Sequence, residues 1–375
     1  MSELYELPDG WEWKKLIETI RIANKTININ DNKKYNCIGL EHIESNTGKL
    51  VDFQTSDGLS IKSSKVVFEK NMVLYGKLRP YLNKVWRAEF SGIATTEILP
   101  FEPLLKILNS NYLANYLRSN FFVENAIKNT SGARMPRVTT KYLKNEVFIP
   151  LPSLQEQKRI VSKLDTLFEK IDKSIALHQK NMDEADVFMG SVLNDVFGEL
   201  EEKYKKQVWS EVLKIKNGKH YKDVIDENGQ YPIYGSGGIM NYANDYLCNE
   251  DTVIIGRKGT INNPLFVKEK FWNIDTAFGI EANKDVLLPM FLFYFSKYFN
   301  FLDLNKSTTL PSLAKTHLLK IIMVLPPLNI QQKVVTYLDE ISQKIEKIKS
   351  VQKEKMQNLV ALKASILDQA FRGEL

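Results

Sequence analysis

Leu-Pro-Ser-Leu-Gln-Glu-Gln-Lys-Arg-Ile-Val runs from Leu151 to Val161, and a related stretch, Leu-Pro-Pro-Leu-Asn-Ile-Gln-Gln-Lys-Val-Val, runs from Leu325 to Val335. The two stretches are 174 positions apart, and the same offset relates the residues that follow as far as the last turns of both copies. Both copies close on Gly-Glu-Leu, with one additional residue in the second. A unit of this length is far longer than a solenoid repeat. The repeat therefore predicts a duplicated module made of a globular part and this stretch.

The repeated stretch has the apolar spacing of a long amphipathic helix. In the first copy the stripe recurs at alternating steps of three and four for about five heptads, interrupted only by Gly190. The stripe consists of Val161, Leu164, Phe168, Ile171, Ile175, His178, Met182, Ala185, Met189, Val192 and Val196. The second copy carries Leu338, Ile341, Ile345, Ile348, Gln352, Leu359, Leu362 and Ile366, with Lys355 breaking one step. We expect helices over residues 151–200 and 326–375, each roughly 65 Å long, that pack against one another.

Two polar residues fall on this stripe at equivalent positions, His178 in the first copy and Gln352 in the second. Polar residues in such a seam can fix the register of paired helices at some cost in stability. The alternative is that each is a tolerated, half-exposed core residue. Neither has neighbours that indicate catalysis.

Length and composition limit the possible classes of protein. The chain has 375 residues, enough for two or three domains, and 43% of them are hydrophobic, as in ordinary globular proteins. No apolar run of about 18 residues and no signal-peptide core is present. The only cysteines, Cys37 and Cys248, are far apart, which predicts a reducing cytoplasm and no metal cluster. The net charge of +6 is compatible with a polyanionic partner without establishing one.

Residues 1–150 and 201–325 form two globular blocks that share an order of features. Val253–Arg257 corresponds to Val73–Lys77, and Thr276 is aligned with Thr96. Strand-like and helical patterns alternate in both blocks. We expect an α/β (α+β) chain in which two α/β domains are each followed by one long helix.

No catalytic arrangement is visible in either block. Gly235–Gly238 lacks the third glycine of a dinucleotide fingerprint and is better interpreted as a flexible loop. The four histidines show no metal-ligand spacing. Pro8-Asp9 followed by Glu12-Trp13-Lys14 superficially matches a nuclease acid–acid–lysine set, but the spacing is too short to bring acids together from two strands.

Cationic and small polar residues recur in loops of both blocks. Such side chains can neutralise phosphates or bond base edges, although a single exposed lysine or arginine is usually only solvated. The candidates for DNA contacts are Lys77, Arg79, Arg87, Arg134, Arg137, Thr139 and Lys141 in the first block, and Lys216, Lys219, Ser236, Arg257, Lys258 and Lys315 in the second. Among these, Arg134, Arg137 and Arg257 are the strongest.

These elements together resemble the specificity (S) subunit of Type I restriction–modification systems over essentially the whole chain. The resemblance rests on Leu7-Pro8-Asp9-Gly10-Trp11, on the loop from Tyr231 to Gly238, on Ile149–Ile160 and on the two Gly-Glu-Leu tails. The second block has lost the Leu-Pro-x-Gly-Trp opening, which blurs where that domain begins.

The resemblance implies a non-catalytic subunit that binds double-stranded DNA. Residues 1–150 and 201–325 would be target recognition domains, each reading one half of a split sequence. The helices at 151–200 and 326–375 would pair antiparallel as a spacer. Two methyltransferase subunits using S-adenosylmethionine and two restriction subunits using ATP and Mg²⁺ would join it, and this chain would bind none of those cofactors.

Three other interpretations remain open. The chain could be the specificity module of a related, Type IIB-like system, or a coiled-coil scaffold that binds no nucleic acid, or a nuclease acting alone. A DNA reader should lose affinity steeply with salt, whereas a scaffold should show no specific binding. A lone nuclease would need divalent-metal-dependent cleavage by the purified chain.

Overall fold

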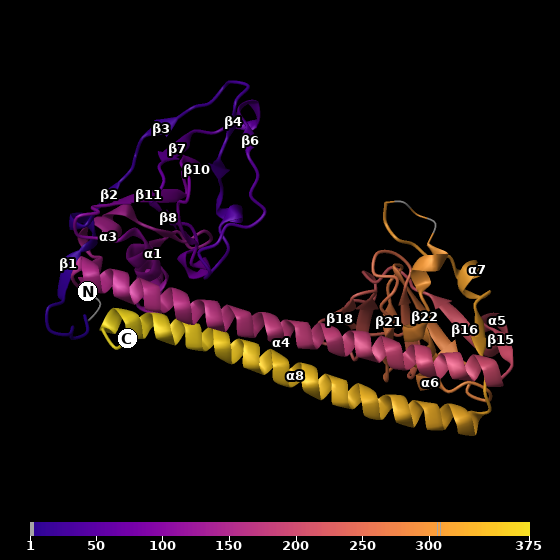
Figure 1. Cartoon of the computed structure of the whole chain (residues 1–375). Coiled ribbons are helices and arrows are strands. Elements are labelled where there is room, and N and C mark those ends of the chain that lie inside the picture. The colour runs from indigo at the N-terminus through magenta and orange to yellow at the C-terminus, as the bar shows by residue number, and fades with distance from the viewer. Residues whose placement is uncertain (1–3, 306, 308) are drawn as a thin grey trace. The chain divides into compact units, whose positions relative to one another are not determined.

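The computed structural model describes residues 4–305, 307 and 309–375 (Figure 1). The chain divides into two compact units. The first unit contains the chain up to Leu177 together with Glu354–Leu375, and the second contains His178–Lys353. Each unit therefore combines one globular domain with a part of both long helices.

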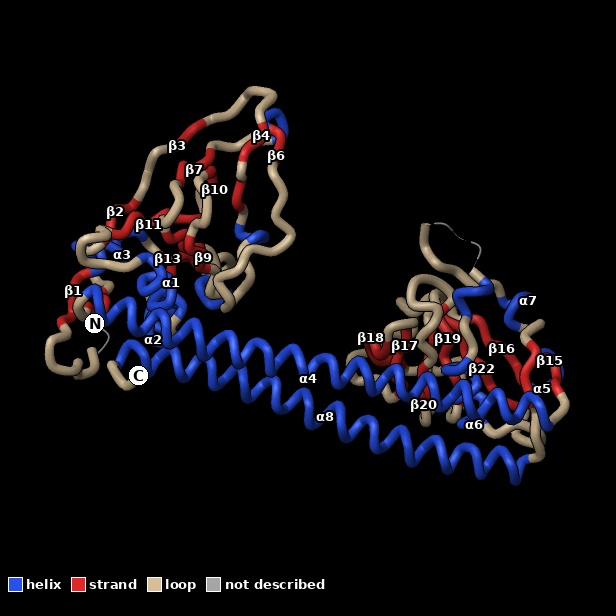
Figure 2. Tube along the Cα trace, in the orientation of Figure 1, coloured by secondary structure: helices blue, strands red, loops and turns tan. Residues whose placement is uncertain are grey.

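The long helices are α4, Leu154–Lys203, and α8, Leu328–Arg372, and they run antiparallel within each unit (Figure 2). In the first unit Nζ of Lys363 lies 2.7 Å from a carboxylate oxygen of Asp172. In the second, Nζ of Lys349 lies 2.8 Å from a carboxylate oxygen of Asp186. The expected intramolecular pair of long helices is confirmed.

The predicted apolar stripe is wrong over part of α8. Ile348 and Leu362 are 47% and 48% exposed, whereas Lys349 and Lys363 are half-buried on the paired face. The aliphatic stems of these lysines cover the seam while their ammonium groups reach aspartates of α4. No helix in the described part of the chain is long and apolar enough to cross a membrane.

The first domain is built on two four-stranded sheets, β2–β11–β8–β9 and β3–β7–β10–β5. A two-stranded ladder, β1–β14, joins its beginning to its end, and the pairs β4–β6 and β12–β13 complete the strands. The strands are β1 (Glu12–Lys15), β2 (Ile20–Ile22), β3 (Thr26–Ile27), β4 (Lys34–Tyr35), β5 (Cys37–Ile38), β6 (Ser56–Asp57), β7 (Lys65–Phe68), β8 (Val73–Gly76), β9 (Val85–Arg87), β10 (Gly92–Thr95), β11 (Ile98–Pro103), β12 (Thr130–Ser131), β13 (Arg137–Val138) and β14 (Phe148–Leu151). The helices are α1 (Ser110–Arg118), α2 (Asn120–Lys128) and α3 (Thr140–Asn145).

The second domain has the same plan with fewer strands. A four-stranded sheet, β16–β22–β19–β20, and a three-stranded sheet, β18–β17–β21, are accompanied by the ladder β15–β23. The strands are β15 (Lys206–Val208), β16 (Leu213–Asn217), β17 (Tyr231–Gly235), β18 (Gly238–Ala243), β19 (Thr252–Gly256), β20 (Leu265–Val267), β21 (Trp272–Asn273), β22 (Ala277–Ala282) and β23 (Ile322–Val324). The helices are α5 (Trp209–Val212), α6 (Pro289–Tyr298) and α7 (Lys315–Leu318). The mixed α/β class is confirmed.

Strand register shows which residues of the two domains are equivalent. Gly76 of β8 pairs with Ile98 of β11, and Gly256 of β19 pairs with Ala277 of β22. Thr276, which precedes Ala277, therefore occupies the position of Glu97. The sequence alignment of Thr276 with Thr96 was wrong by one residue, because a weakly similar segment offers no signal to fix a single-residue shift.

A buried glutamine attaches each domain to the start of its helix. The side-chain amide of Gln157 donates to the carbonyl oxygens of Ile107 and Pro152, both at 2.9 Å, and its oxygen accepts from the Asn109 N–H at 2.8 Å. Gln331 makes the same three bonds, to Val286 O and Pro326 O and from Leu288 N, each at 2.8 Å. Both side chains are fully buried. The two glutamines are 174 positions apart, so the attachment is itself repeated.

Candidate nucleic-acid interface

In the first domain the loop after β8 lies against the segment that contains β13. Leu78 and Arg137 form an isolated β-bridge. The N–H of Arg79 donates to Pro136 O at 2.7 Å, and the N–H of Val138 donates to Lys77 O at 2.9 Å. We call residues 77–79 and 136–138 junction 1.

The second domain builds the same contact, which we call junction 2, from residues 257–259 and 311–313. Lys258 and Ser312 form the isolated bridge. The N–H groups of Gly259 and Leu313 donate to Pro311 O and Arg257 O, both at 2.9 Å. Each hydrogen bond of junction 1 thus has its counterpart in junction 2.

Glycine ends the strand that leads into each junction. A side chain at Gly256 would collide with the carbonyl oxygen of Thr260, and one at Gly76 would meet Leu40 and the carbonyl oxygen of Lys84. The chain therefore turns back closely after each buried strand and brings the next residues to the surface. The cationic residues Lys77 and Arg257 follow these glycines directly.

Two of the predicted arginines lie at junction 1, and a third lies in the bend just before it in the sequence. Arg79 is exposed and has a left-handed backbone, with φ 51° and ψ 65°. Arg134 is exposed in the bend between β12 and β13. Arg137 is half-exposed, with Nε 3.1 Å from an oxygen of Glu97 and Nη1 donating to Met135 O at 3.2 Å. Sequence reasoning missed Glu97, since only the strand register places it beside Arg137.

At junction 2, exposed Arg257 and Lys258 are accompanied by Ser236. Nη1 of Arg257 donates to Asp275 O at 3.4 Å, and its guanidinium carbon lies 5.9 Å from the centre of the Phe278 ring. The Ser236 hydroxyl donates to the carbonyl oxygen of Lys258 at 3.4 Å. The end of β17 and the loop after β19 therefore meet.

Other predicted residues have local partners that give them a structural role. Nζ of Lys216 pairs with Glu281 at 2.8 Å, and Nζ of Lys315 donates to Ile215 O at 2.7 Å. The Thr139 hydroxyl accepts from the N–H of Tyr142 at 3.2 Å and caps α3. Lys141 and Lys219 are exposed.

Arg87 lies apart from junction 1. Its Nη1 donates to Oδ1 of Asn71 at 2.9 Å. It lines a polar cavity of about 250 Å³ with Arg118 and Asp165 of α4. Burial lowers the pKa of Arg118 to about 10. Burial also raises the pKa of Asp165, although the charges of Arg118 and Arg87 partly offset that rise. Arg118 therefore remains charged near neutral pH.

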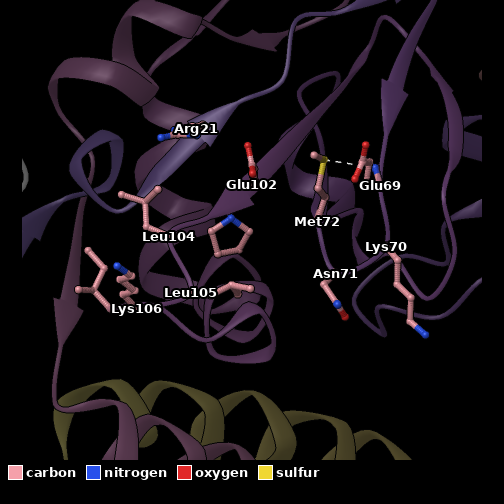
Figure 3. A pocket seen from close by; sticks show the side chains of 11 residues that line it. Arg21, Glu69, Lys70, Asn71, Met72, Glu102, Leu104, Leu105 and Lys106 are labelled. Carbon is pink, nitrogen blue, oxygen red and sulfur yellow. Dashed lines mark hydrogen bonds between the residues drawn. The ribbon is translucent and has the colours of Figure 1, made fainter.

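A large hollow of the first domain shows no catalytic arrangement. This cavity, of about 550 Å³, is lined by charges of both signs, including Arg21, Lys106, Glu69 and Glu102 (Figure 3). Within the described residues, no group of three or more His, Cys, Asp or Glu could hold a metal ion. Burial raises the pKa of the Cys248 thiol to about 12, so it is protonated near neutrality and a poor nucleophile.

Residues 8–181 and 201–355 match the family described as the Type I restriction modification DNA specificity domain. The chain is 30% identical over 171 residues to the Type I restriction enzyme EcoDI specificity subunit of Escherichia coli, covering 46% of this chain and 38% of that protein. It is 21% identical over 417 residues to the putative type I restriction enzyme MjaX specificity subunit of Methanocaldococcus jannaschii, covering 100% and 96%. The EcoDI match thus spans well under half of that relative.

Solved structures share the fold at 24% sequence identity. One chain, from work on complex assembly and conformational transition of the type I R-M system, has a TM-score of 0.77 and covers 99% of this chain and 100% of its own. The HsdS subunit from Thermoanaerobacter tengcongensis has a TM-score of 0.53, with 99% of both chains covered.

Proposed function

The chain belongs to the family of Type I restriction-modification DNA specificity subunits, and on that premise we propose that it reads a split DNA target, one half through each globular domain. It then serves as the non-catalytic recognition subunit of a methyltransferase and endonuclease complex. The observation that carries the proposal is the repetition of one cation-bearing junction in both domains, with the same backbone bonds.

The chemistry of the junctions suits DNA. Exposed guanidinium and ammonium groups neutralise phosphates, and arginine can also bond the acceptor edge of guanine. The side chains differ between the junctions, with Arg79 and Arg137 in the first and Arg257 and Lys258 in the second. A common backbone with different side chains supports two half-sites of different sequence.

The helices supply a spacer in this proposal. α4 extends without interruption from the first unit into the second, and α8 returns. Because a helix has a constant rise per residue, its length sets a constant gap between half-sites.

Exposed apolar residues on the helices support docking of a methyltransferase. Leu177 and Val351 are equivalent by the 174-residue offset, and so are Phe188 and Leu362, and all four are exposed. Because equivalent positions carry apolar side chains that the chain itself leaves uncovered, two copies of one partner could each use one set. S-adenosylmethionine would bind that partner, and ATP and Mg²⁺ would bind restriction subunits.

The test is a methylome. The chain is expressed with its methyltransferase in a host without DNA methylation, and N6-methyladenine is mapped by single-molecule sequencing. We expect one split motif with a constant gap, and exchange of residues 1–150 for those of another family member should change one half only. An assembled complex that methylates nothing and binds no DNA in a salt-dependent manner would contradict the proposal in favour of a scaffold.

A further inference from the structure

The two junctions act as internal controls for each other. Their backbones bond identically, so any residue that the backbone requires should be present in both. Several positions fail this test, and at three of them a charged residue of the first domain has an uncharged counterpart in the second. Arg79 and Arg137 of junction 1 correspond to Gly259 and Ser312 of junction 2, and Glu97, beside junction 1, corresponds to Thr276.

The Arg137–Glu97 pair is therefore dispensable for building the junction. The second domain has Ser312 and Thr276 in place of Arg137 and Glu97, and these two residues cannot form an ion pair. Junction 2 nevertheless keeps the isolated bridge and both flanking hydrogen bonds. The second domain therefore lacks both members of the ion pair, not one alone. A half-exposed ion pair contributes little stability, so stability does not explain its presence.

The contacts of Arg137 leave one edge of its guanidinium available. Nε faces both oxygens of Glu97, at 3.1 and 3.2 Å, and Nη1 donates to Met135 O. A guanidinium has five N–H donors in a rigid plane, so these bonds orient the group and leave the donors of Nη2 and one of Nη1. Both donors of Nη2 stay available in this way, and with a donor of Nη1 they can face two adjacent acceptors.

We propose that Arg137 reads a guanine in the half-site bound by the first domain, and that Glu97 is a positioning residue that holds Arg137 for this contact. Guanine presents two adjacent acceptors, N7 and O6, in the major groove, and a bidentate arginine is their commonest specific partner. The inference rests on the proposed function. The second domain, with Ser312 and Thr276, needs no guanine at the equivalent place.

The first experiment compares the methylated motif of the wild-type complex with those of Arg137→Ala and Glu97→Gln. We expect one G·C position in one half to become degenerate, with a loss of discrimination of about 5- to 150-fold for Arg137→Ala. Glu97→Gln should lose discrimination at the same position. Glu102→Gln, on the strand β11 that follows Glu97 but away from the junction, is the matched control and should leave the motif unchanged.

A second variant separates reading from folding. Glu97→Thr with Arg137→Ser gives junction 1 the residues of junction 2, so the complex should assemble with an unchanged thermal midpoint while the same position relaxes. An unchanged motif in these variants, relaxation of both halves, or a first half without guanine would overturn the proposal while leaving the proposed function intact. A wild-type complex that produces no split motif would overturn both.

Discussion

His178 and Gln352 occupy the same position in the two copies of the repeat, and they bind each other: Nδ1 of His178 donates to Oε1 of Gln352 at 2.5 Å. When two copies of one helix pair antiparallel, a residue contacts its own equivalent only if the two copies are aligned about that residue. The bond therefore identifies the register of α4 on α8 with a polar pair in the seam.

Replacing this pair tests its role in register. His178→Leu alone leaves the half-buried amide of Gln352 without its partner and should lower the free energy of unfolding by about 1–3 kcal/mol. The double variant His178→Leu with Gln352→Leu should recover most of that loss, because two apolar side chains fill the seam. Urea unfolding of the wild type, both single variants and the double variant gives the coupling energy. Additive effects would show that the bond does not hold the register.

The buried glutamines give a prediction for each unit separately. Gln157→Ala leaves two carbonyl oxygens and one N–H without partners, so we expect a loss of about 2–3 kcal/mol. Hydrogen exchange should increase at residues 107–109, and not at residues 286–288. Gln331→Ala should give the reverse pattern. Gln155→Ala, an exposed neighbour, serves as the control, and equal exchange in both units would contradict separate attachments.

The long helices were predictable from sequence because their stripe repeats over many turns, yet the face of α8 was partly missed. Lys349 and Lys363 lie on the seam, at the positions of α8 that are equivalent to Ile175 and Met189 of α4. A hydrophobicity pattern discards lysine, whereas the 174-residue offset applied to the first stripe places both correctly. The physical reason is that a lysine stem packs like an aliphatic side chain once a carboxylate receives its ammonium group.

The junctions could be predicted only as loops that bear cations. Nothing local in the sequence distinguishes Arg137, held beside Glu97, from Arg87, bonded to Asn71 at a different place on the domain. Their partners lie in turns elsewhere in the sequence, and the positions of those turns depend on the strand register of the whole sheet. Sequence could therefore name residue types for a DNA interface, while the grouping of those residues required the fold.

The Asp172–Lys363 pair predicts an acid dependence of the helix pairing. Although burial opposes ionisation, the hydrogen bonds and charges of Lys363 and Lys49 lower the pKa of Asp172 below its usual value. A lowered folded-state pKa contributes stability above the unfolded value of 3.8, and that contribution is lost as pH falls through the folded value. Asp172→Asn should therefore destabilise the chain at pH 7, by about 0.5 kcal/mol given its exposure, and by less at pH 3.

Urea unfolding at both pH values measures this effect in wild type and variant. Asp183→Asn on α4 is the control, since Asp183 is exposed and forms no ion pair among the described residues. An Asp172→Asn effect that is larger at pH 3 than at pH 7 would contradict the assigned sign.

Arg79 offers a substitution in which stability and DNA affinity should move in opposite directions. Its left-handed backbone costs a non-glycine residue about 1–2 kcal/mol, and Gly259 occupies the equivalent position with φ 77°. Arg79→Gly should therefore stabilise the chain. The gain should not exceed about 1 kcal/mol, because glycine loses more conformational freedom on folding and this loss offsets part of the relieved strain. If the exposed guanidinium contacts a phosphate, the same change should weaken binding to all DNA sequences alike and reduce the salt slope by about 1. Urea unfolding measures the stability, and fluorescence anisotropy across a salt series measures the DNA affinity and the salt slope, with Lys173→Gln on α4 as the charge-matched control. A stabilised variant with unchanged affinity and salt slope would remove Arg79 from the interface.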